Sequence, residues 1–300
     1  MTHAPAGVAE DLMPGLRRVL AVNPSPMTGR GTNSYIVGTG EVALIDPGPD
    51  DPAHLAALMA DLRPGERVSH IFVTHAHRDH SALTRAVARA TGAPVLAFGD
   101  AVAGRSPLMQ ALAARERPVG GEGADADFRP DILLADDTLV SHGDWSIRAL
   151  HTPGHFGNHL CFQWGDQVFS GDHVMGWSSS VVAPPDGEMA AYMASLDRLM
   201  ATGAARLWPG HGDPVADPAA RITALARHRR DRAAAIRAAL LSGPATPTDL
   251  ARAIYTDTPP ALLGAASLNV FAHLIEMAEN NTAEPEGAIR FSARFRPLPG

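Results

Sequence analysis

One hexapeptide restricts what this chain can fold into more strongly than any other segment. It reads His-Ala-His-Arg-Asp-His and spans residues 75–80. Imidazole and carboxylate are ligand types that suit zinc and several other divalent metals. An apolar run at residues 68–73 precedes the hexapeptide, and a helical pattern at residues 81–90 follows it. The sequence therefore predicts a metal-binding cluster on a turn between a strand and a helix.

Side-chain direction divides this cluster between two ions. Residues two apart in an extended segment point to the same face, so we expect His75 and His77 to reach one ion. Asp79 and His80 follow the bend and are expected to face a second ion. Each ion needs further ligands, and loops at strand ends are a common place for such groups. Three later apolar runs each end in a turn with a ligand-type residue: His155, Asp172 and His211.

The order of these residues resembles that of the metallo-β-lactamase superfamily, in which His-x-His-x-Asp-His is followed by His, Asp and His. The resemblance implies a ligand set for a first ion (His75, His77, His155), a second ion (Asp79, His80, His211) and a bridging position (Asp172). It also implies two divalent metal ions as cofactors. We expect zinc, while manganese or iron would suit the same ligands.

Further segments resemble the beta-lactamase-like protein 2 branch of that superfamily, which includes endoribonucleases and is similar to thioesterases of polyketide pathways. They are the opening segments 31–35 and 44–48, the motifs at 155–159 and 170–173, and a long C-terminal extension. One departure is Ser-Ala-Leu at residues 81–83, where many family members have Gly-Gly. The resemblance implies an α/β fold, an αββα sandwich with a C-terminal helical, winged-helix-like extension.

Hydrophobic periodicity and composition divide the chain into a catalytic domain, residues 1–217, and a C-terminal domain, residues 218–300. The first contains two groups of predicted strands, each with helices outside, which indicates two stacked sheets with the metal site along one edge. Residues 99–129 are expected to form an irregular insertion that borders the site. The second should contain three helices, the last over residues 268–278, and a β-hairpin arm at residues 287–295. We expect this domain to be a lid over the cleft.

Composition restricts the compartment and the partners. All 25 basic residues are Arg, so a catalytic lysine is excluded. Residues 1–217 hold 15 Arg and 25 acidic residues, which argues against tight nucleic-acid binding. Cys161 is the only cysteine, so we expect no internal disulfide and a cytoplasmic location. No apolar run approaches the roughly 20 residues of a membrane helix, so no membrane association is expected. The sequence does not decide whether the protein forms a homo-oligomer.

The expected chemistry is hydrolysis at a dinuclear metal centre. Two divalent ions lower the pKa of a shared water, and the bridging hydroxide is expected to attack a small ester or thioester-type acyl substrate. Asp79 should orient the nucleophile and Asp172 should set the metal spacing, which makes them the catalytic carboxylates. Asp46 is expected to accept a hydrogen bond from a ligand histidine. Candidates for contacts with the substrate are Asn33, Tyr35, His159, Trp177 and Ser178.

Other functions compete with this one. A metal-dependent endoribonuclease would cleave single-stranded RNA with salt-sensitive binding. A non-catalytic metal-binding sensor is the alternative of a different class, although seven ligands argue against it because structural sites are normally closed. Antibiotic hydrolysis is the least favoured, since we expect no export signal. A small molecule is therefore the expected partner, and RNA is not favoured.

Overall fold

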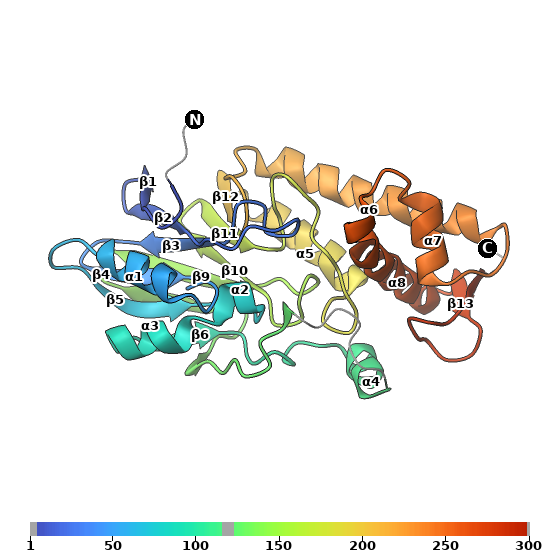
Figure 1. The fold of residues 1–300 in the computed structure, drawn as a ribbon, viewed down its shortest axis with the longest axis horizontal. Helices are drawn as coiled ribbons and strands as arrows, with labels where there is room; N and C mark the ends of the chain where they lie inside the picture. Colours follow the sequence, from blue (N-terminus) through green and yellow to red (C-terminus); the bar gives the residue numbers. More distant parts are fainter. Residues whose placement is uncertain (1–4, 116–122, 299–300) are drawn as a thin grey trace.

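Two β-sheets are stacked face to face, with helices covering both outer surfaces (Figure 1). The structure is a computed structural model that describes residues 5–115 and 123–298. The first sheet has seven strands in sequence order: β1 (Glu10–Met13), β2 (Leu16–Leu20), β3 (Asn33–Val37), β4 (Glu41–Ile45), β5 (Arg67–Phe72), β6 (Val95–Ala97) and β7 (Ile132–Leu133). The second has five strands in the order β12 (Arg206–Pro209), β11 (Gln167–Gly171), β10 (Leu160–Trp164), β9 (Trp145–His151) and β8 (Leu139–His142).

The central strands are buried on both faces because the other sheet covers one face and helices cover the other. All five residues of β3 are buried. Since side chains alternate along a strand, Tyr35 packs between the two sheets while Ile36 packs toward the outer helices. Phe72 and Trp145, from opposite sheets, meet edge to face with their ring centroids 5.8 Å apart. The αββα sandwich expected from the sequence is confirmed.

Helices seal the outer face of each sheet. α1 (Pro52–Ala60) and α3 (Thr84–Thr91) bury Leu58 and Val87 against the first sheet. The Asp51 side chain caps α1 by accepting a hydrogen bond from a backbone N–H of its first turn. On the second sheet, α5 (Met189–Ala201) packs together with the first half of α6 (Pro218–Leu240), as Figure 1 shows.

The strand directions bring the metal-binding loops to one edge of the sandwich. β4 and β5 are parallel in the first sheet, and β9, β11 and β12 run in one direction in the second. The loops after β5, β9, β11 and β12 carry the candidate ligands. Backbone bonds of 2.7 Å join the two sheets here, from Leu160 N to Thr74 O and from Asn33 N to Gly210 O. The edge is therefore a rigid junction of both sheets.

The C-terminal helices pack around their own apolar core. It consists of the second half of α6, α7 (Pro247–Ile254), a short 3₁₀ turn (Pro260–Leu262) and α8 (Leu263–Glu279), closed by β13 (Ala283–Pro285) and β14 (Phe295–Pro297). Thr246 and Asp249 form a reciprocal capping box that fixes the start of α7. Because α6 contributes to both cores, the division at residue 217 stays a prediction.

Three expectations about local structure were wrong. The segment 99–129 is not wholly irregular, because it contains the helix α4 (Pro107–Arg115), whose Met109 and Leu112 are buried in the C-terminal core. Residues 116–122 of that segment lie outside the described residues. The predicted arm at residues 287–295 is mostly the loop between β13 and β14. α8 begins at Leu263, five residues before the predicted start.

One helix corrects the expectation about apolar runs. The stretch Pro260–Glu279 is long and apolar enough to cross a membrane by length and composition. It contains α8, and 61% of its most apolar window is buried inside the protein. A core helix of a folded domain passes the same test, so this burial accounts for the apolar character of α8.

Candidate metal centre

Seven side chains with metal-binding atoms gather at the sandwich edge in two groups. Within each group the candidate ligand atoms lie within 4.8 Å of one another. The first group comprises His75, His77, His155 and Asp172, and the second comprises Asp79, His80 and His211. They are the seven residues that the sequence analysis named. α2 (Arg78–Ser81) carries Asp79 and His80, one turn after the strand-end histidines.

The donor distances in the first group fit a single divalent ion. His77 Nδ1 lies 2.9 Å from His75 Nε2 and 3.1 Å from His155 Nε2. His155 Nε2 lies 3.8 Å from Asp172 Oδ2. A tetrahedral zinc ion with ligands at about 2.0–2.1 Å separates those ligands by about 3.3 Å. The donors therefore have the spacing of a coordination shell.

The second group has the same spacing and shares one carboxylate with the first. His211 Nε2 lies 3.3 Å from His80 Nε2 and 3.2 Å from Asp79 Oδ2. Asp172 reaches into this group as well, with Oδ1 at 3.4 Å from His80 Nε2 and Oδ2 at 3.3 Å from His211 Nε2. One carboxylate that faces both groups suits a ligand shared by two cations.

Backbone carbonyls orient two of the ligand histidines. Nδ1 of His155 donates to the Val181 carbonyl at 2.6 Å, and Nδ1 of His211 donates to the Gly31 carbonyl at 3.1 Å. A carbonyl oxygen can only accept, so the proton of each neutral ring must be on Nδ1. In the neutral ring, Nε2 is therefore the nitrogen whose lone pair can bind a metal.

Asp46 orients two further ligand histidines, His80 and His75. Its Oδ2 accepts from His80 Nδ1 at 2.9 Å, which confirms the expected bond to a ligand histidine. The same oxygen accepts from the Thr74 hydroxyl at 2.8 Å, and that hydroxyl accepts from His75 Nδ1 at 3.0 Å. Asp46 is 2% exposed and has a positive φ of 51°, a conformation that Asp tolerates better than most residues. One buried carboxylate thus orients a ligand in each group.

The two groups differ in their protonation. Burial lowers the pKa of His77 to about 3 and that of His75 well below its usual value, so these rings are neutral and able to bind a metal. Burial would also lower the pKa of His211, but the Asp172 carboxylate and its hydrogen bond raise that pKa to about 10. The pKa of His80 is raised well above its usual value by neighbouring carboxylates, against the effect of burial. Without a metal, the protons of His80 and His211 occupy the position that a divalent cation would take in the second group.

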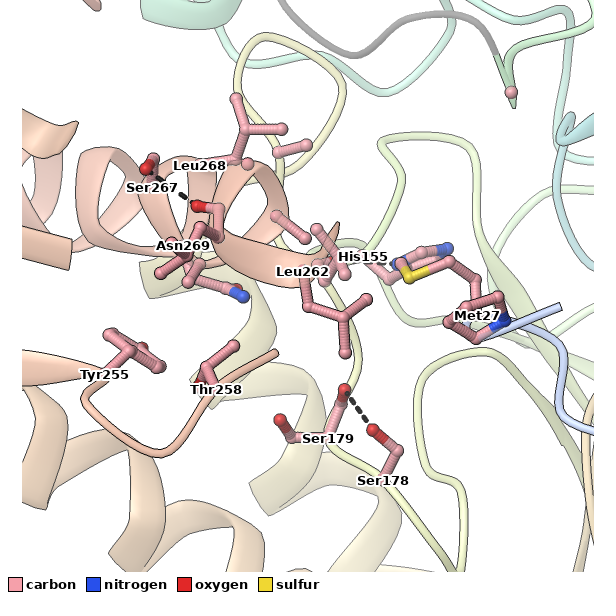
Figure 2. Close-up of a pocket in the computed structure, with 18 of the residues that line it drawn as sticks. Met27, His155, Ser178, Ser179, Tyr255, Thr258, Leu262, Ser267, Leu268 and Asn269 are labelled. Atoms are coloured by element: carbon pink, nitrogen blue, oxygen red, sulfur yellow. Dashed lines mark hydrogen bonds between the residues drawn. The ribbon is translucent and has the colours of Figure 1, made fainter. Parts of the chain in front are cut away.

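The metal centre opens into a cleft of about 1050 Å³ between the sandwich and the C-terminal helices. Figure 2 shows His155 and Met27 on one side of this cleft and the residues of α8 on the other. That volume is just above the range of about 300–1,000 Å³ for ligand sites. Gly123 also lines it, so the segment 99–129 borders the site as expected. The apolar part of the wall includes Met27, Met175, Leu262, Leu263 and Leu268.

Of the five predicted substrate contacts, Ser178 lines the cleft. Trp177 is 47% exposed but packs beside Gly29 and Gly212, outside the cleft lining. His159 is fully buried and its Nδ1 bonds to the Thr152 hydroxyl at 3.0 Å. Neither side chain belongs to the described cleft lining, and contact of Trp177 or His159 with a substrate stays a prediction.

Asn33 and Tyr35 also lie outside the described cleft lining, and their contact with a substrate stays a prediction. Both side chains are buried, and both donate to the Pro209 carbonyl, from Asn33 Nδ2 at 2.9 Å and from the Tyr35 hydroxyl at 2.7 Å. Pro209 ends β12 immediately before the loop with His211. The Asn33 amide nitrogen and the Tyr35 hydroxyl thus help to fix the position of a ligand loop.

The sequence analysis expected the C-terminal domain to be a lid over the cleft but did not name the residues with which this domain lines it. Arg252, Tyr255 and Thr258, from α7 and the segment after it, line the cleft together with Asn269 of α8. One signal was present in the sequence, since Asn269 interrupts the apolar run of this helix between Leu268 and Val270. A polar residue in such a run needs a partner or a function.

Comparison with known proteins agrees with this geometry. The profile of the metallo-beta-lactamase superfamily matches residues 27–211, and that of the beta-lactamase associated winged helix domain matches residues 246–290. A protein named beta-lactamase-like protein 2 homolog, from Drosophila melanogaster, is 28% identical over 282 residues, which cover 92% of this chain and 89% of the relative. The atrochrysone carboxyl ACP thioesterase dmxR1 of Cryptosporiopsis sp. is 29% identical over 77% of this chain and 65% of its own length.

A solved structure shows the same fold along the whole chain. The beta-lactamase domain protein from Burkholderia ambifaria has a TM-score of 0.81 and 20% identity, and the match covers 99% of this chain and 95% of that one. The superfamily profile spans more than half of the chain, including all seven candidate ligands. The chain therefore belongs to the metallo-β-lactamase superfamily of hydrolases and carries the winged-helix domain associated with it.

Proposed function

We propose that this protein is a dinuclear metal-dependent hydrolase that acts on an ester or thioester with an apolar acyl group. The observation that supports this proposal best is the junction of two ligand groups, sharing Asp172, with a large cleft. The apolar wall of that cleft suits an acyl chain, because burying it removes apolar surface from water.

The roles of the residues follow from their positions. Two bound divalent ions would lower the pKa of a shared water and polarise the substrate carbonyl. The neutral imidazoles of His75, His77 and His155 would hold the first ion, and Asp172 would hold both at a fixed separation. Asp79 lines the cleft with its carboxylate 27% exposed, where it would bind the second ion and orient the attacking water.

Two further observations favour an acyl substrate over RNA. One similar protein is named an ACP thioesterase, which hydrolyses a thioester. Arg252 is the one arginine in the described lining of the cleft, whereas a groove that binds several nucleotides needs several cations. We propose zinc as the resident ion and the cytoplasm as the location, as expected from the ligand types and the single buried cysteine.

The test measures hydrolysis by protein that has been stripped with a chelator and then reloaded with zinc, manganese or iron. Octanoyl thioester of N-acetylcysteamine and a fluorescent single-stranded RNA are the substrates. We expect metal-dependent thioester hydrolysis that is lost in Asp172→Ala. It should be retained in Asp166→Ala, because Asp166 is an exposed residue directly before β11 and belongs to neither ligand group. Cleavage of RNA that is faster than hydrolysis of the thioester would instead support the endoribonuclease hypothesis. Metal binding without turnover of either substrate would favour the hypothesis of a non-catalytic metal-binding sensor.

A further inference from the structure

A buried arginine joins the C-terminal domain to the wall of the cleft. Arg229, on α6, is 1% exposed. Its guanidinium donates to the Ser180 carbonyl and, at 3.2 Å, to Asn269 Oδ1, and it lies 5.0 Å from the centroid of the Tyr192 ring. These partners are a carbonyl, an amide oxygen and an aromatic face, none of which carries a charge. A buried cation with neutral partners depends on the exact position of each of them.

Two donors fix the orientation of the Asn269 amide. Oδ1 accepts from Arg229 and also from the backbone N–H of Val182 at 2.9 Å, so both of its lone pairs are used. The amide nitrogen must therefore point away from these partners. Asn269 lines the cleft, and Figure 2 shows it on the cleft side of α8. No acceptor for its Nδ2 is found within the described part of the chain. The side chain thus presents a fixed donor that the protein itself does not use.

A short loop connects this donor to the metal centre. Val182, which bonds to Asn269, directly follows Val181, whose carbonyl accepts from His155 Nδ1 at 2.6 Å. The carbonyl of the preceding residue, Ser180, accepts from Arg229. Residues 180–182 therefore contact a metal ligand on one side and the C-terminal domain on the other. Asn269 is thus linked to the first ligand group through residues 181 and 182.

We propose that Asn269 Nδ2 recognises an acceptor oxygen on the acyl chain of the substrate, and that Arg229 is the positioning residue that orients it. This inference rests on the proposed function. The neighbouring wall is apolar and, among the residues that the structure describes, offers the Asn269 N–H no acceptor. An acyl chain without an oxygen therefore leaves this donor unpaired, whereas an acyl chain with an oxygen pairs with it. The guanidinium on Oδ1 polarises the amide and strengthens its N–H as a donor. The substrate class is an oxygenated acyl ester or thioester.

The test compares two thioesters of N-acetylcysteamine, β-ketooctanoyl and octanoyl, with wild type and Asn269→Asp. Aspartate keeps the acceptor for Val182 and Arg229 and removes the donor, so the variant should fold. We expect Asn269→Asp to reduce the ratio of kcat/KM for the keto substrate over the plain one by about tenfold, mainly through KM. The matched control, Asn280→Asp at the exposed end of the same helix, should keep the wild-type ratio.

A second variant separates positioning from folding. Arg229→Met should reduce the same ratio while the metal content per chain stays at the wild-type value, because the seven ligands are intact. A purely structural role of Arg229 would instead lower kcat/KM for both substrates equally. That result would overturn the assignment of Arg229 as a positioning residue. An unchanged ratio in Asn269→Asp would overturn the inference alone. If wild type hydrolyses neither thioester, the proposed function fails and the inference fails with it.

Discussion

Replacing Asp46 by Asn isolates the effect of one carboxylate that belongs to neither ligand group. The change keeps the size of the side chain, and Asn also tolerates the positive φ of 51° at this position. The Oδ1 acceptor for the Thr74 backbone N–H, at 2.7 Å, can be retained. The variant loses the negative charge that accepts from His80 and, through the Thr74 hydroxyl, orients His75. We therefore expect a folded protein with weaker metal binding.

The size of the effect follows from these contacts. Loss of an outer partner of a metal-binding histidine typically lowers metal affinity or activity by about 10–100-fold. That factor corresponds to about 1.4–2.7 kcal/mol. His80 bonds to Asp46 directly, whereas His75 reaches it through one hydroxyl. The ion of the second group should therefore lose more affinity than the ion of the first.

The assay is competition for zinc with a chromophoric chelator, which resolves two stepwise dissociation constants. Asp144→Asn is a matched control, because Asp144 also accepts from a threonine N–H and hydroxyl, those of Thr39, but is exposed and remote from the site. The control should bind zinc as wild type does. If Asp46→Asn binds both ions within twofold of wild type, the assignment of Asp46 as an orienting group is refuted.

Three other predictions follow from the structure. In Gly210→Ala, the new Cβ would lie 2.5 Å from His80 Cε1 and 2.6 Å from Asp172 Oδ1, so elemental analysis should show reduced metal content and the far-ultraviolet circular dichroism should be unchanged. Burial lowers the pKa of His54 to about 4, so this neutral ring contributes stability that is present above its unfolded pKa of about 6.5 and is lost as the pH falls toward 4. In urea titrations of metal-free protein, wild type should therefore lose about 2 kcal/mol more than His54→Leu between pH 7 and pH 5, and equal losses would contradict this. Free zinc at 100 times its dissociation constant should stabilise the fold by about 2.7 kcal/mol, seen as a higher Tm that chelator reverses; an unchanged Tm would argue against a site formed only in the folded state.

The sandwich and the gathering of ligands could be predicted because their signals are local. The strands that precede the candidate ligands contain short apolar runs, and each ligand follows such a run within a few residues. Parallel strands place their carboxyl ends at one edge, so residues as distant as His75 and His211 meet there. The expected bond from Asp46 to a ligand histidine also followed from its position at a strand end.

The residues that line the cleft could not be predicted because they depend on packing between distant segments. Met109 and Leu112 form a helix in a segment with a weak pattern because they pack into the C-terminal core. Tyr35 was expected to contact substrate, but its hydroxyl donates a hydrogen bond to the Pro209 carbonyl of β12. Asn269 is a single polar residue in an apolar helix, and its function depends on contacts with Arg229 and Val182 that no sequence pattern shows.

The central claim is that two ligand groups sharing Asp172 hold two divalent ions. The most direct measurement is the metal content of the full-length protein by inductively coupled plasma mass spectrometry, after saturation with zinc and removal of free ions. The structure predicts two equivalents of zinc per chain in wild type and fewer in Asp172→Ala. One equivalent or none in wild type, or two equivalents retained in Asp172→Ala, would contradict the account.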